Sequence, residues 1–175
     1  AKVTFENKKD EIIIDPSESE TPVVPETPDA NAPTMIYSEE GVDLFAKGVV
    51  FTNGGPYPTA QDVTISAPKG LKSVKVTIEA GNEGFQGIVE EMNFTNRELI
   101  GDTELKDLLS SLGVTLNLPE ANAISYVFPI GTFYKFMDIY GATDSGKAHK
   151  FIISVEDNDT KKVEKALNVT INAQQ

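Results

Sequence analysis

The stretch KFIISVEDNDTKKVEKALNVTIN, residues 150–172, decides the fold class of this protein. Bulky apolar residues alternate with other residues in both halves of the stretch, which is the period-two pattern of strands with one buried face. The alternating positions are Phe151, Ile153 and Val155 in the first half and Leu167, Val169 and Ile171 in the second. A polar segment separates the two halves, so we expect them to pair as antiparallel strands.

The same alternation appears earlier in the chain. Residues 63–66 alternate before a turn at residues 67–70, which contains a proline and a glycine. A second alternating run, residues 74–78, follows the turn, so the pattern predicts a hairpin between the two runs. Residues 124–130 form another candidate strand, and Pro129 marks its end because proline cannot donate to a central ladder.

Two segments show helical periodicity instead. Residues 102–112 place four leucines at i, i+3, i+4 and i+7, with Asp102 suited to the N-cap and Gly113 to the position past the end. Residues 132–140 place Met137 and three aromatic residues on one face between two glycines. Because each apolar stripe must pack against a sheet, we expect two short insertions that cap the open ends of a β-sandwich.

The N-terminal part differs in composition from the rest of the chain. Residues 1–40 contain 10 acidic and 3 basic residues, and residues 15–33 contain five of the ten prolines. Such a segment cannot bury enough apolar surface to offset its ordering entropy, so we interpret it as an extended linker. The run Ile12–Ile14 before it indicates a short strand that must pack on a sheet. We therefore divide the chain into an N-terminal strand and linker, residues 1–34, and a sandwich domain, residues 35–175.

The final hairpin resembles the last two strands of bacterial immunoglobulin-like modules. In those modules the penultimate strand reads aromatic-x-aliphatic-x-Val-x-Asp, as residues 151–157 do here, and a polar turn leads to a closing strand such as residues 167–172. Residues 67–76 resemble their early hairpin. Together these stretches resemble the immunoglobulin-like modules near the N-termini of surface lipoproteins of gut-type Gram-negative bacteria, some of which carry a downstream domain assigned to carbohydrate metabolism.

This resemblance implies an immunoglobulin-like antiparallel β-sandwich with two short helical insertions, placed outside the cytoplasm at the cell surface. In the lipoproteins a lipidated cysteine precedes an acidic, proline-rich tether, so the resemblance implies a lipid anchor upstream of Ala1. The chain departs from antibody-type domains because it has neither their cysteines nor their tryptophan. The two predicted helices also exceed a minimal sandwich.

Charge and composition exclude several classes of function. Fifteen Lys and Arg against 27 Asp and Glu give a formal net charge of −12, which repels nucleic acids and anionic lipid surfaces. With no cysteine and only one histidine, His149, the chain cannot form thiolate or two-histidine metal sites, and we expect no metal or cofactor. No run of 18 apolar residues occurs, so we expect no membrane-spanning segment.

Few titratable residues suggest chemistry. Asp157 and Asp159 offer oxygen ligands to Ca²⁺ in the polar turn, but Asp and Asn are also good turn formers, and calcium binding stays open here. Glu90 and Glu91, taken as neighbours on a strand, would point to opposite faces and make a poor glycosidase pair. We expect His149 at a strand end facing water. No catalytic residue is predicted, and we do not expect an enzyme.

Aromatic residues supply the candidate ligand contacts. The stripe within residues 133–140 is expected to face the core, but Tyr134 lies off that stripe and is expected to be exposed. Tyr57 lies at the tip of the loop 53–58, whose glycines and prolines indicate an irregular connection. Tyr57 and Tyr134 are therefore our candidate ligand-binding residues, because tyrosine presents a flat apolar ring with a polar edge.

These observations predict a non-enzymatic, extracytoplasmic module of a cell-surface protein that acts as a spacer or docks neighbouring domains or surface proteins, in a context of glycan acquisition. One alternative is a carbohydrate-binding module that uses Tyr57 or Tyr134. A second is a surface-fibre or adhesin subunit that pairs through the strand at Ile12–Ile14. Partners and oligomeric state stay open.

Overall fold

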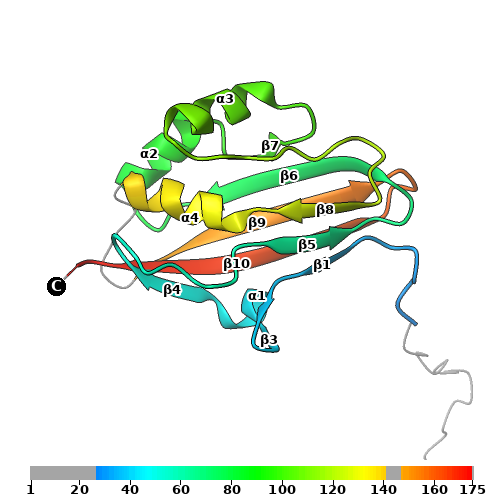
Figure 1. Cartoon of the computed structure of the whole chain (residues 1–175), viewed down its shortest axis with the longest axis horizontal. Helices are drawn as coiled ribbons and strands as arrows, with labels where there is room; N and C mark the ends of the chain where they lie inside the picture. The colour runs from blue at the N-terminus through cyan, green and yellow to red at the C-terminus, as the bar shows by residue number, and fades with distance from the viewer. Residues whose placement is uncertain (1–26, 141–146, 175) are drawn as a thin grey trace, which may run out of the picture.

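The computed structural model describes residues 27–140 and 147–174, whose arrangement is shown in Figure 1. Strands make up 36% of these residues and lie in several sheets, with few helices between them. In chain order the elements are β1 (Thr34–Ile36), β2 (Ser38–Glu39), β3 (Val42–Asp43), α1 (Leu44–Lys47), β4 (Val49–Thr52), β5 (Val63–Ser66), β6 (Leu71–Glu79), α2 (Glu83–Glu91), β7 (Arg97–Glu98), α3 (Thr103–Ser111), β8 (Ser125–Phe128), α4 (Ile130–Ile139), β9 (Ala148–Asp157) and β10 (Lys162–Asn172).

The larger sheet has five strands in the order β4-β10-β9-β6-β7. β9 and β10 pair antiparallel near its centre, with Phe151 opposite Leu167 and Val155 opposite Val163. The hairpin predicted from residues 150–172 is therefore confirmed. β4 lies parallel beside β10, whereas the remaining neighbours in this sheet are antiparallel.

The predicted hairpin across the turn at residues 67–70 is wrong. β5 pairs with β1 and β8 in a three-stranded sheet, whereas β6 pairs with β9 and β7 in the larger one. The amide of Ala67 donates to the carbonyl of Ile124 at 2.8 Å, and the amide of Leu71 donates to the carbonyl of Ala123 at 2.9 Å. The turn therefore carries the chain from one sheet to the other. Alternation predicts which side chains are buried, but it does not select the neighbouring strand.

The core lies between the two sheets. The rings of Phe128 in β8, Phe133 in α4 and Phe151 in β9 have centroids 4.9 to 5.9 Å apart. The three-stranded sheet and α4 therefore cover one face of the larger sheet, in front of β9 and β10 in Figure 1. The other face is polar and carries cross-strand ion pairs such as Lys150 to Glu79 at 2.9 Å. The result is a β-rich, sandwich-like arrangement with helices added to the covered face.

Both predicted helices are present. The carboxylate of Asp102 accepts a hydrogen bond from the amide of Leu105 at 3.0 Å, which caps α3 as expected. Gly113 follows α3 with φ of 72°, in the left-handed region that glycine tolerates. α4 begins directly after Pro129, which ends β8 as predicted.

Sequence reasoning missed α1 and α2. Glu90 and Glu91 lie in the last turn of α2 and not on a strand, which corrects our placement of this pair. Asn82 caps α2 by accepting a hydrogen bond from the Phe85 amide at 2.8 Å, and Phe85 and Val89 form its buried i, i+4 pair. Two glycines in this segment lower its intrinsic helix propensity, so packing of the apolar pair stabilises the helix.

The N-terminal predictions extend beyond the described part of the chain. The strand at Ile12–Ile14 and most of the linker lie outside the described residues. Near the start of the described chain, Asp29 forms an ion pair with Lys161 beside the turn between β9 and β10. β1 begins at Thr34, next to the predicted boundary. None of the helices in residues 27–140 and 147–174 is long and apolar enough to cross a membrane.

Candidate functional site

Tyr134 is buried, contrary to our expectation of an exposed ligand contact. Only 1% of the residue is accessible, and its ring lies 5.6 Å from that of Phe51 in β4. Its hydroxyl lies 2.8 Å from the hydroxyl of Tyr37, which donates to the carbonyl of Ala60 at 2.8 Å. α4 packs against the core on one side, and the chain around Tyr37 and Ala60 covers another side. A residue off the main apolar stripe of α4 is therefore also buried. Tyr134 is therefore a core residue.

Tyr57 is half-buried, so the prediction of a freely exposed loop tip is also wrong. Its hydroxyl donates to Oδ2 of Asp138 in α4 at 2.5 Å. The amide of Gly54 and the side chain of Asn53 donate to the same carboxylate, at 3.0 and 2.6 Å. Burial and the contact with Asp138 raise the pKa of Tyr57 to about 12. These hydrogen bonds connect the loop 53–58 to Asp138 in α4. The Tyr57 hydroxyl is therefore used in a contact within the protein.

His149 lies at the start of β9, as expected, but it is buried and does not face water, which corrects that part of the expectation. Its Nδ1 accepts a hydrogen bond from the amide of Gly81 at 2.9 Å, and its ring packs edge to face on Phe85 at 5.1 Å. Gly81 belongs to the connection from β6 to α2, and Phe85 belongs to α2 itself. Both elements therefore cover the start of β9. His149 therefore joins β9 to that connection.

The polar turn between β9 and β10 is organised by Asp157. This residue is buried, and its Oδ1 accepts a hydrogen bond from the Lys161 amide at 2.9 Å. Oδ2 has no hydrogen-bond partner in the described chain. Ca²⁺ takes six to eight oxygens, and no group of three or more acidic or histidine residues within the described ranges can hold a metal ion. Asp157 acts as a turn residue, and Asp159 is exposed.

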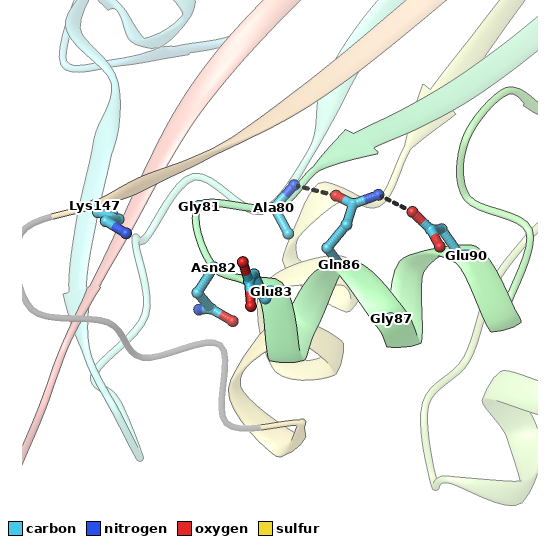
Figure 2. Close-up of a pocket in the computed structure, with 8 residues that line it drawn as sticks. All are labelled: Ala80, Gly81, Asn82, Glu83, Gln86, Gly87, Glu90 and Lys147. Carbon is cyan, nitrogen blue, oxygen red and sulfur yellow. Dashed lines mark hydrogen bonds between the residues drawn. The ribbon is translucent and has the colours of Figure 1, made fainter.

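A groove of about 390 Å³ lies beside α2 at the end of β6. Figure 2 shows Gln86 across its wall, where Oε1 accepts from the Ala80 amide at 3.2 Å and Nε2 donates to Glu90 at 3.0 Å. Lys147 lies at the opposite end, just before β9. The amide of Gly81 is already engaged by His149. The Gln86 side chain therefore joins α2 to the connection that follows β6, and Gly81 joins this connection to β9.

The outward face of the three-stranded sheet carries exposed apolar side chains. Ile36 in β1 lies opposite Thr64 in β5, and Thr64 lies opposite Val127 in β8. Ile36 is 61% exposed and Val127 is 56% exposed. We call these three residues the outer row. Ile124, just before β8, is also exposed. Exposed apolar side chains gathered on one face mark an interaction surface more often than scattered ones do.

Sequence reasoning missed the outer row, although a signal was present. Ile36 lies between the buried residues Met35 and Tyr37, and Val127 lies between Tyr126 and Phe128. A strand with water on one face normally alternates apolar and polar residues. In each of these two strands one outward position is apolar, Ile36 or Val127, although the other outward position is polar, Thr34 or Ser125. That departure from alternation identifies positions whose outward face is suited to contact another molecule.

A scan against protein-family models matches none, and searches of curated proteins and solved structures find no match.

Proposed function

We propose that this chain is a non-catalytic docking module with an immunoglobulin-like sandwich, and that the outer row binds a protein partner. One observation carries the proposal: Ile36 and Val127 expose apolar side chains on the same face of one sheet, on either side of Thr64. Burial of such side chains at the centre of an interface supplies much of its binding free energy.

Further features support the immunoglobulin-like fold, the place outside the cytoplasm and the docking role. The facing sheets consist mainly of antiparallel strands, as in immunoglobulin-like sandwiches. The resemblance of residues 150–172 to the final hairpin of surface-lipoprotein modules supports a place outside the cytoplasm. A docking role also suits an acidic chain, because its net charge of −12 opposes non-specific association with polyanions.

The test is site-specific photocrosslinking in cells that produce the full chain. A photoreactive phenylalanine analogue at position 36 or 127 should form a discrete protein adduct. The matched control is position 50, because Val50 is 64% exposed on the polar face of the larger sheet. Adducts of equal yield at positions 36 and 50, or none at 36 and 127, would contradict the proposal.

Affinity for the partner identified in this way gives a second readout. Covering side chains that are about 60% exposed contributes about 1 kcal/mol each, so Ile36→Thr with Val127→Thr should weaken binding about 30-fold. Val50→Thr should leave the affinity unchanged. Threonine suits exposed strand positions, so the free energy of unfolding of each variant should stay within about 0.5 kcal/mol of the wild type.

A further inference from the structure

Negative charge is concentrated on one side of the outer row. Asp62 is exposed and immediately precedes β5, and extending the alternation of β5 by one residue places it on the Thr64 face, about 7 Å along the strand direction. Asp43 and Ile36 line the same hollow of about 250 Å³. Both carboxylates are exposed, and neither has an ion-pair partner within residues 27–140 and 147–174. The row on the other side is uncharged and consists of Thr34, Ser66 and Ser125.

The spacing of the outer row matches a helix. Its three residues lie on neighbouring strands, so successive members are about 4.8 Å apart. An α-helix advances about 5.4 Å per turn, so a helix lying across the strands presents roughly one turn to each strand. Its residues at i, i+4 and i+7 would then meet the row. An extended segment instead pairs with a sheet edge through its main chain.

We propose that the occupant of the outer row is an amphipathic helix of a partner, with lysine or arginine along the flank that faces Asp43 and Asp62. This inference rests on the proposed function and specifies the chemistry of the partner. Because Asp43 and Asp62 lie on one side of the outer row only, the basic flank of the helix must face that side, which sets the orientation of the helix. A second copy of this chain is disfavoured, because two molecules of net charge −12 repel each other.

The probe is a displayed library of helical peptides with apolar residues fixed at i, i+4 and i+7 and both flanks randomised, selected on the full chain. Lysine and arginine should be enriched on one flank only. For a selected peptide, Asp43→Asn with Asp62→Asn should weaken binding about fivefold, and the loss should shrink as salt is added. Asparagine keeps the N-cap that Asp43 supplies to α1.

The matched control removes two charges elsewhere. Asp107→Asn with Glu164→Gln changes exposed positions on α3 and β10, so binding should stay within about twofold because distant surface charges are screened. Peptides that require Ile36 and Val127 but carry neutral or acidic flanks would overturn this inference and leave the proposed function intact. If no selected peptide depends on the outer row, the inference of a helical occupant fails, whereas the proposed function is decided separately by the crosslinking at positions 36 and 127.

Sedimentation velocity of the chain alone tests the competing occupant. A monomer at all concentrations agrees with a helical partner. A concentration-dependent dimer that disappears in Ile36→Thr with Val127→Thr would assign the outer row to a second copy and overturn the inference of a basic helix.

Discussion

The paired hydroxyls of Tyr37 and Tyr134 allow a test in which two similar substitutions, Tyr37→Phe and Tyr134→Phe, should lower the free energy of unfolding by unequal amounts. Tyr37 has one hydroxyl proton, and it donates that proton to the carbonyl of Ala60. The hydrogen bond between the two hydroxyls must then be donated by Tyr134. Burial raises the pKa of both groups, so both keep their protons at neutral pH.

The expected magnitudes follow from this direction of donation. Tyr134→Phe removes one hydrogen bond and leaves Tyr37 bonded to Ala60, so it should cost about 1 kcal/mol. Tyr37→Phe removes two hydrogen bonds and leaves the buried Tyr134 hydroxyl without an acceptor, so it should cost about 2 to 4 kcal/mol. The double variant has no buried hydroxyl left unpaired, so it should be no less stable than Tyr37→Phe alone.

Urea unfolding followed by circular dichroism measures these differences. A loss of 2 kcal/mol with a slope of about 2 kcal/mol/M lowers the midpoint of Tyr37→Phe by about 1 M, and Tyr134→Phe should shift about half as far. Phenylalanine keeps the ring of each residue, so packing is matched. A larger cost for Tyr134→Phe than for Tyr37→Phe, or additive costs in the double variant, would refute the direction of donation.

Two further predictions concern carboxylates that join elements. Asp138→Asn should lower the pKa of Tyr57 from about 12 but leave it above 10, because the negative charge is lost while burial remains. NMR titration with ring-labelled tyrosine measures this pKa. An unchanged pKa would contradict the contact between Tyr57 and Asp138. Burial opposes the ionisation of Asp102, but the hydrogen bonds from Arg97 and from the Leu105 amide outweigh burial and lower the pKa of Asp102. The ionised carboxylate therefore stabilises the fold above pH 4, and this stabilisation is lost as the pH falls further. Asp102→Asn should therefore lose less stability than the wild type between pH 7 and about 2.5 in urea unfolding, and equal losses would exclude this role.

Local patterns predicted the elements whose signals lie in neighbouring residues. The hairpin of β9 and β10 has strict alternation in both strands and a short polar turn, so its pairing follows from sequence alone. α3 has a cap at Asp102, a leucine stripe and Gly113 after its end. α2 lacked so clear a pattern, because two glycines interrupt it and its buried pair is only Phe85 and Val89.

The candidate site was predicted less well than the fold. Tyr57 and Tyr134 were chosen as exposed rings, but Asp138 holds the first and Tyr37 the second. These partners lie 81 and 97 residues away from them in the chain, so no local pattern indicates the contacts. Ile36 was not singled out, although its place between Met35 and Tyr37 departs from strict alternation, because the sequence does not show which face of the strand is covered.

By itself the sequence determined an acidic, β-rich chain, the central hairpin, the strand end at Pro129 and the capped helix α3. Apart from the net charge, which is a sum over the whole chain, these features depend on residues that are close to one another in the sequence. Only the tertiary structure decided that β5 and β6 lie in different sheets and that His149 is buried beneath α2. It also decided that Ile36 and Val127 share one exposed face. Alternation specifies two faces for every strand, but the packing of the layers determines which neighbours each strand has and which faces meet water.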